Sequence, residues 1–135
     1  MTPDPLPRTG PLPRPTTPAA AREHLRAEAF PAPQVQKVTL TATEFTSICP
    51  RTGQPDFGSV VIEYSPADRC LESKALKFYL WSFRDEGAFC ESLAARIADD
   101  IVYAIAPKAL RVEVRQNVRG GIAILAEAER GGRLD

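Results

Sequence analysis

The chain has 135 residues, and its 17 basic and 17 acidic side chains give a formal net charge of zero at neutral pH. A balanced charge creates no overall field that would attract nucleic acid or an anionic membrane, so we expect neither as a partner. No apolar run approaches the roughly 20 residues that span a bilayer, and the N-terminus lacks an uninterrupted apolar segment of signal-peptide type. We therefore expect a soluble, cytoplasmic protein.

The first 33 residues are rich in proline and hold nine of the chain's 13 prolines. Proline fixes φ and lacks an amide proton, so such a segment favours extended, polyproline-like disorder over helix or sheet. The exception is residues 19–30, whose Ala, Arg, Glu and Leu content favours a short helix that would need a surface to pack on. We therefore predict a disordered arm over residues 1–33, one folded domain over residues 34–128 and a polar tail over residues 129–135.

After the arm, the spacing of apolar side chains predicts four strands and two helices. Alternation of apolar and polar residues is typical of half-buried strands, and apolar residues at i, i+4 and i+7 are typical of amphipathic helices. The order strand, strand, helix, helix, strand, strand indicates an α+β fold, a ββααββ unit with an antiparallel sheet and two helices on one face. The predicted strands cover residues 34–43, 58–64, 110–114 and 122–126, and the predicted helices cover residues 72–84 and 88–106.

A four-stranded sheet of this kind has two unpaired edges and one uncovered face. Exposed edges invite aggregation, and a chain without net charge has no charge repulsion to oppose it. Pairing the edges between subunits removes them, so we expect a homo-oligomer whose units assemble into a ring.

The three cysteines and the single histidine exclude several kinds of site. Cys49, Cys70 and Cys90 are an odd number without a C-x-x-C pair, which suits a reducing compartment. The only histidine, His24, lies far from them in the arm, so we expect no metal site and no Ser-His-Asp or Cys-His nucleophile. The chain has no G-x-G-x-x-G or P-loop pattern, so a nucleotide would not be held by a Rossmann or P-loop device.

The segment around Cys49 has the layout of a reactive site, because Pro-Arg-Thr-Gly-Gln-Pro and then Asp56 follow the cysteine. Two prolines and a glycine favour tight turns, so the loop can hold a thiol and a carboxylate at a fixed separation. A thiolate can add to an electrophile, and a nearby carboxyl can move a proton. The spacing alone leaves a second interpretation open, which is a buried cysteine near a turn aspartate.

Two segments together resemble a known enzyme family. CPRTGQPDFG at residues 49–58 and ESKALKFY at residues 72–79 are similar to the two signatures of the 7-cyano-7-deazaguanine reductases, the nitrile reductases of queuosine biosynthesis, in their short single-module form. The resemblance extends from about residue 43 to residue 124. It implies the tunnelling fold, in which such units close into a barrel, two rings stack and the sites lie between subunits.

The resemblance also implies a reaction and a role for individual residues. The substrate would be 7-cyano-7-deazaguanine, a small 7-deazapurine nitrile, which NADPH would reduce to 7-aminomethyl-7-deazaguanine. Cys49 would be the nucleophile that forms a thioimide, and Asp56 would be the proton donor. The substrate would be bound by Leu71, Glu72, Ser73, Cys90 and Glu91. The cofactor would be bound by Ser73, Lys74, Lys77, Arg119 and Gly120.

The sequence departs from the family pattern at Cys90, where the family reads Phe-His-Glu and this chain reads Phe-Cys-Glu. A thiol cannot replace an imidazole as a cation or as a two-ended hydrogen-bond partner. Two other functions therefore stay open: an amidine-forming transferase on the same scaffold, which uses the thioimide without hydride, and a non-catalytic ligand-binding or assembly module. Lys74 and Arg119 favour the reductase. Without the resemblance, Lys74 and Lys77 would form a solvated helix face, and Glu91 would be a first-turn glutamate that stabilises its helix.

Overall fold

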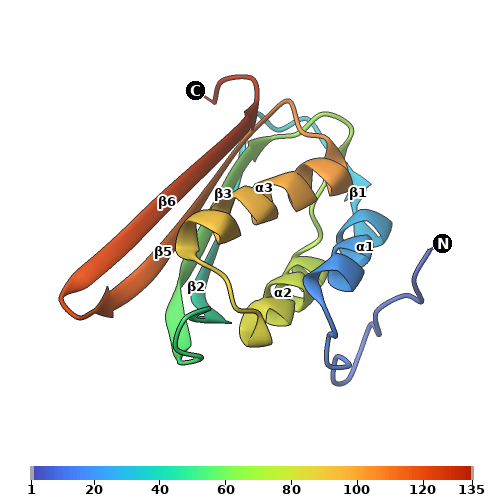
Figure 1. The fold of residues 1–135 in the computed structure, drawn as a ribbon. Helices are drawn as coiled ribbons and strands as arrows, with labels where there is room; N and C mark the ends of the chain where they lie inside the picture. The colour runs from blue at the N-terminus through green and yellow to red at the C-terminus, as the bar shows by residue number, and fades with distance from the viewer. Residues whose placement is uncertain (1, 135) are drawn as a thin grey trace.

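The structure, a computed structural model, describes residues 2–134 and confirms an α+β fold (Figure 1). Three α-helices lie on one side of a four-stranded antiparallel sheet whose strand order is β2-β3-β5-β6. A separate two-stranded sheet joins β1 to β4. The elements are α1 (Pro18–Glu28), β1 (Phe30–Pro31), β2 (Val38–Ile48), β3 (Pro55–Ser65), β4 (Arg69–Cys70), α2 (Ser73–Trp81), the 3-10 helix η1 (Ser82–Asp85), α3 (Cys90–Ile105), β5 (Ala109–Arg119) and β6 (Ile122–Gly131).

Strands β2 and β3 are longer than predicted and leave only a short connection between them. β2 continues to Ile48 instead of ending at residue 43, and β3 begins at Pro55 instead of residue 58. The ladder pairs Ile48 with Pro55 and Ser47 with Asp56, and proline is tolerated as the first residue of a strand. The predicted reactive loop is therefore a hairpin connection over residues 49–54, and Asp56 lies on a strand.

Strands β5 and β6 also extend beyond their predicted ends. Their pairing runs from Ala109 with Gly131 to Arg119 with Ile122. Backbone hydrogen bonds continue the ladder where the alternation of apolar side chains has already stopped. The prediction of a polar tail from residue 129 was therefore wrong for its first three residues, which belong to β6.

The two predicted helices are confirmed as α2, which continues into η1, and α3. The Glu72 carboxylate caps α2 by accepting hydrogen bonds from the amides of Lys74 and Ala75. Helix α3 ends where Ala106 adopts the left-handed conformation, with φ of 41°. The next residue, Pro107, cannot continue the helix. Helix α3 packs across β5 and β6, so it forms the main cover of the sheet.

The prediction of a disordered arm over residues 1–33 differs from the structure, where helix α1 of this segment is part of the core. Thr17 caps α1, because its hydroxyl oxygen accepts a hydrogen bond from the amide of Ala20 at 3.1 Å. The side chain of Leu25 is fully buried, and α1 packs on α2 and α3. A helix that is marginal alone is stabilised by such packing. The helical layer consequently has three helices instead of the expected two.

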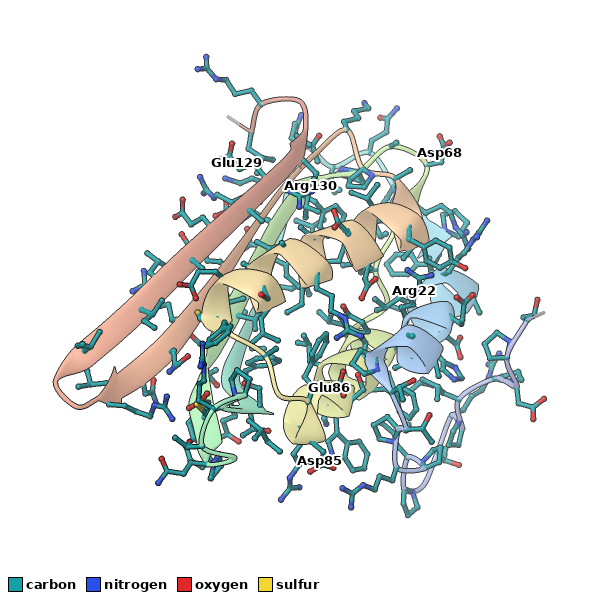
Figure 2. The ribbon with its side chains drawn as sticks, viewed as in Figure 1. Arg22, Asp68, Asp85, Glu86, Glu129 and Arg130 are labelled. Carbon is teal, nitrogen blue, oxygen red and sulfur yellow. The ribbon has the colours of Figure 1, made fainter. Side chains whose placement is uncertain are left out.

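A buried polar network joins these three helices. The Tyr79 hydroxyl donates to Asp100 Oδ2 at 2.5 Å, and Arg22 Nη1 donates to Asp100 Oδ1 at 3.2 Å. Burial, followed by the charge of Asp100, raises the pKa of Tyr79 well above its usual value. Figure 2 labels Arg22 on α1, and it labels Arg130 on β6, whose guanidinium bonds Asp99 of α3. The arm helix is thus tied to the domain by charge as well as by apolar contact.

The sheet face away from the helices is charged, and both outer strands lack a partner. Glu63 forms ion pairs with Arg111 at 2.6 Å and with Lys37 at 3.4 Å. Within residues 2–134, strands β2 and β6 each pair on one side only. None of the helices in this part of the chain combines the length and apolar character needed to span a bilayer.

Candidate active site

Cys49 is the first residue after β2, and the loop that follows closes on its backbone. Its amide donates to the Gln54 carbonyl, and its carbonyl accepts from the Gly53 amide, both at 2.9 Å. Gly53 has φ of 73°, a conformation in which other residues are strained. The motif glycine therefore allows the loop to fold around Cys49, whose side chain is buried.

The loop stabilises the thiolate form of Cys49. The Thr52 hydroxyl has the largest effect, followed by the backbone amides of Thr52 and Arg51 and then by the side chain of Arg119. These hydrogen bonds lower the pKa of Cys49 from 9.0 to about 7, against a smaller opposing effect of burial. Successive amides directed at one atom form an anion-binding nest. A large fraction of Cys49 is therefore in the nucleophilic form near neutral pH.

Replacing Thr52 with valine should raise the pKa of Cys49 toward 9.0, because the lost hydroxyl contributes most to lowering it. The rate of iodoacetamide alkylation at Cys49, followed against pH by peptide mass spectrometry, should have its midpoint near 7 in the wild type and at higher pH in Thr52→Val. Thr52→Ser keeps a hydroxyl and is the matched control. Equal midpoints for the valine and serine variants would contradict the hydroxyl's role.

Asp56 lies on β3 and is 5% exposed, and it meets Arg119 from the end of β5. The distance from Arg119 Nη1 to Asp56 Oδ1 is 2.5 Å. This contact is an ion pair without hydrogen-bond alignment, so Oδ1 has no hydrogen-bond partner among the described residues. Arg119 therefore joins the buried carboxylate to the Cys49 thiol, which it also contacts. The sequence placed Arg119 at the cofactor phosphates, whereas in this chain it lies with the two catalytic candidates.

Cys90 and Glu91, at the start of α3, have different surroundings. Cys90 is buried, and its thiol donates to the Val114 carbonyl at 3.3 Å. Burial, followed by the charges of Glu91 and Asp56, raises the pKa of Cys90. Glu91 is exposed on the first turn of the helix. The Cys90 thiol is therefore a neutral group that points toward β5 and lies close enough to Asp56 for its charge to affect the thiol. Glu91 is accessible to a ligand.

The second motif lies at the start of α2, where its polar side chains are held in different ways. The Glu72 carboxylate is occupied by its helix cap, and the amide of the buried Leu71 donates to the Tyr64 hydroxyl at 3.0 Å. Lys74 Nζ donates to the backbone carbonyl of Pro7 at 3.0 Å. Glu72 and Leu71 thus shape the segment, and the lysine next to them is oriented by the arm.

A cavity of about 1260 Å³ lies between β2 on one side and α2 with η1 on the other. It reaches the nucleophile loop, because Ile48 and Gly53 line it. The cations Lys77 and Arg84 and the aromatic rings of Trp81 and Phe57 line it as well, together with the acidic Glu44 and Asp85. Its volume exceeds the roughly 300–1,000 Å³ of common small-molecule sites. Cations suit phosphates and an aromatic ring suits a flat base, so this lining fits a nicotinamide dinucleotide.

The remaining cysteine and the histidine take part in packing. All three cysteines are free thiols, and Cys70 is buried before α2. His24 of α1 meets the Phe78 ring edge-on, with ring centroids 5.0 Å apart. Within residues 2–134, no group of three or more His, Cys, Asp or Glu side chains is placed to hold a metal ion.

Comparisons with known proteins agree with this geometry. A family model described as "QueF-like protein" matches residues 55–133. This chain belongs to the QueF family. A protein named NADPH-dependent 7-cyano-7-deazaguanine reductase from Anaeromyxobacter sp. (strain Fw109-5) is 49% identical over 109 residues, which cover 78% of this chain and 89% of that relative. A protein of the same name from Nitrosospira multiformis is 43% identical over 112 residues, which cover 81% of each chain.

A solved structure also matches this QueF-family chain. The archaeosine synthase QueF-Like in its apo form has a TM-score of 0.70 and 26% sequence identity, and the match covers 76% of this chain and 100% of that one. Because the solved chain is covered completely, the remainder of the present chain has no counterpart in it. The shared part confirms the tunnelling fold that the two motifs implied.

Three groups contact the expected site residues without having been predicted from the sequence: Thr52, the Arg51 amide and Pro7 of the arm. The Thr-Gly step three residues after Cys49 is the signal that could have indicated the nest, because a positive φ at Gly53 lets the loop turn its amides toward the sulfur. The contact of Pro7 with α2 had no such signal, since it depends on where the arm packs.

Proposed function

We propose that this chain is an NADPH-dependent nitrile reductase that converts 7-cyano-7-deazaguanine into 7-aminomethyl-7-deazaguanine, a cytoplasmic step of queuosine biosynthesis. The observation that carries the proposal is the activated Cys49 thiol, which shares Arg119 with the buried Asp56 at the end of a cavity lined by Lys77. Relatives that are 43% and 49% identical to this chain over the aligned residues are named for this activity.

The first step of the reaction is carried out by Cys49. Its thiolate adds to the electrophilic nitrile carbon, so that a carbon–sulfur bond forms and one π-electron pair moves to nitrogen. The Asp56 carboxylate takes up the proton that leaves the Cys49 thiol and passes it to that nitrogen, which completes a thioimide. Reduction to an amine requires two hydrides, which two NADPH molecules would supply one after the other when bound in the cavity, and two protons balance the charge. Between the two reductions the carbon–sulfur bond breaks, which restores the Cys49 thiolate and leaves an imine.

Arg119 supports both catalytic residues before the substrate arrives. Its guanidinium stabilises the Cys49 thiolate and balances the charge of Asp56. Ser73 and Lys77 on the cavity wall would hold the cofactor phosphates together with Lys74. Gly120, next to Arg119 in the β5–β6 turn, has a positive φ and would offer its backbone amide to the same phosphates.

The substrate ring would be recognised from the start of α3. The two oxygens of the exposed Glu91 can accept hydrogen bonds from a ring N–H and an exocyclic amine together. The backbone of Leu71 and Glu72 would border the ring on the other side, and Cys90 would fill the space of the family's histidine. A single subunit leaves Glu91 open to solvent, so this site needs a second subunit to exclude water.

Ring assembly would supply that second subunit. The edges of β2 and β6 are unpaired, and the β5–β6 hairpin exposes large apolar side chains. Val118 is 64% exposed, Ile122 is 67% exposed and Leu125 is 48% exposed. Apolar side chains gathered at one end of a hairpin mark an interaction surface. We place the interface between subunits here, with the units closed into stacked rings.

Light scattering should therefore give a molar mass several times the 14.8 kDa of one chain. Replacing Ile122 with aspartate puts a charge into the proposed interface and should lower both the molar mass and the activity. Arg133→Asp, at an exposed position beyond β6, is the control and should assemble normally. A fully active monomer would contradict a site that is built between subunits.

A second candidate is an amidine-forming transferase, which the solved archaeosine synthase QueF-Like supports at 26% identity. That reaction would use the same Cys49 thioimide and replace hydride by ammonia or an amine. The identity to the proteins named as reductases is higher, and the cavity carries cations suited to a phosphorylated cofactor. Both observations favour the reductase.

The product of the purified protein decides between these functions. With 7-cyano-7-deazaguanine and NADPH, liquid chromatography with mass spectrometry should detect the primary amine, and NADPH should be oxidised in step with it. Formation of an amidine from the nitrile and ammonia without NADPH oxidation would establish the transferase instead. A binding module would form neither product.

A further inference from the structure

The proline-rich arm is anchored over the start of α2. The side chain of Leu6 is 4% exposed and belongs to the hydrophobic core. Its amide donates to Glu28 Oε1 at 3.1 Å. The next residue, Pro7, offers its carbonyl to Lys74 Nζ at 3.0 Å. The beginning of the arm is thus held on α1 and the core through Leu6, and on the cofactor motif through Pro7.

The arm is anchored again at the other end of the α2–η1 segment. Arg14 forms an ion pair with Asp85 at 2.5 Å, and the next residue, Pro15, is buried. Figure 2 labels Asp85 at the end of η1, and Figure 1 shows the dark blue arm turning below α1 before it enters that helix. Because both ends are held, the residues between them must bridge the length of α2.

The bridging residues form one wall of the large cavity. Gly10, Pro11 and Leu12 line it together with Lys77 and Trp81 of the α2 side. Gly10 has φ of 82°, and a Cβ built on it would meet nothing within 4 Å. A side chain at Gly10 would therefore be strained by the backbone conformation alone, and relief of that strain would move the bridge.

Lys74 keeps its charge available although the arm holds its position. The Pro7 carbonyl is neutral and uses one of the three ammonium protons. Among residues 2–134, no carboxylate lies within 4.0 Å of the ammonium groups of Lys74 or Lys77. Two lysines without an acidic partner, one of them oriented by a carbonyl, suit a phosphorylated ligand.

We propose that the arm completes the cofactor site: the hydrogen bond from Lys74 to the Pro7 carbonyl fixes the start of the arm on α2, and Gly10–Leu12 form a wall of the cavity and cover the bound NADPH. This inference rests on the proposed function, because it takes NADPH as the ligand of the cavity.

The test is NADPH binding without substrate, measured by quenching of Trp81. This residue is the chain's only tryptophan and lines the cavity, so its emission reports occupancy directly. Gly10→Val should displace the bridge and weaken NADPH binding about tenfold, and Leu12→Ala should weaken it about threefold by removing apolar wall. Thr16→Ala, at an exposed arm position outside the cavity, should bind NADPH like the wild type. Thermal melting followed by circular dichroism checks that each variant folds. If Gly10→Val does not fold, the NADPH affinity of Leu12→Ala decides the test.

The possible outcomes distinguish a failure of the arm's role in NADPH binding from a failure of the proposed reductase function. Quenching that is weaker in Leu12→Ala and Gly10→Val than in Thr16→Ala supports the inference. Equal affinities in all variants overturn it and leave the cofactor assignment intact. A wild type that reduces the nitrile but shows no quenching places NADPH elsewhere, which overturns the inference and keeps the reductase. A wild type that neither binds nor reduces overturns both.

Discussion

Replacing Cys49 with alanine should lower the rate of nitrile reduction by about a thousandfold or more, because removal of a covalent nucleophile leaves only the binding contribution to catalysis. The loop should keep its shape, since the Cys49 amide and carbonyl make its closing hydrogen bonds and both remain. NADPH binding and the melting temperature should therefore change little. Steady-state oxidation of NADPH at saturating nitrile measures the effect.

Cys70→Ala is the matched control for this substitution. Cys70 is also a buried free thiol, but it lies outside the nucleophile loop and does not line the cavity. Its loss should leave the rate within about twofold of the wild type and cost only packing. Equal losses of activity in the two variants would mean that both substitutions act by destabilising the fold. The assignment of Cys49 as the nucleophile would then fail.

Gly58→Ala should destabilise the fold by about 2–4 kcal/mol, the largest effect on stability that we expect from a single added methyl group. A Cβ at Gly58 would lie 1.8 Å from the Arg115 carbonyl oxygen. Both atoms belong to paired strands, in which Gly58 faces Gln116, so neither can move without breaking the ladder. Asp56 and Arg119 lie just beyond this point on the same two strands, so separation of the strands should also break their ion pair.

Gly87→Ala provides the comparison for the glycine in β3. A Cβ at Gly87 would meet Pro50 Cα at 3.5 Å, which is ordinary van der Waals contact. This variant should unfold within about 0.5 kcal/mol of the wild type. Urea unfolding followed by circular dichroism measures both variants. If Gly58→Ala unfolds at the same urea concentration as Gly87→Ala, the close approach of β3 and β5 at this point is wrong.

Periodicity predicted the central elements well because their apolar side chains face one core. Helix α3 and the middle of each long strand follow from that pattern. The ends of the strands do not follow from it, because polar residues such as Ser47 and Arg119 remain in the ladder through backbone hydrogen bonds. Helix α1 was underestimated for a related reason. Its stability comes from the burial of Leu25 and the pairing of Arg22 with Asp100, and local propensity contains neither.

The site was predictable only where its residues are close in sequence. The motif around Cys49 predicted a loop that holds Cys49 and Asp56 at a fixed separation, and in the structure both residues belong to the β2–β3 hairpin. Arg119 joins them from a distant hairpin, so its approach to Asp56 depends on the pairing of β3 with β5. The contact of Lys74 with Pro7 depends in the same way on the path of the arm. Tertiary contacts of this kind leave no periodic signal in the sequence.

Intact mass spectrometry of the protein incubated with 7-cyano-7-deazaguanine in the absence of NADPH tests the central claim most directly. Addition of the thiolate precedes reduction, so the wild-type chain should gain the mass of one nitrile molecule, and peptide mapping should place it on Cys49. Cys49→Ala should show no gain, and Cys70→Ala should be modified like the wild type. An unmodified wild-type mass at saturating nitrile, or an adduct that persists in Cys49→Ala, would contradict the covalent mechanism.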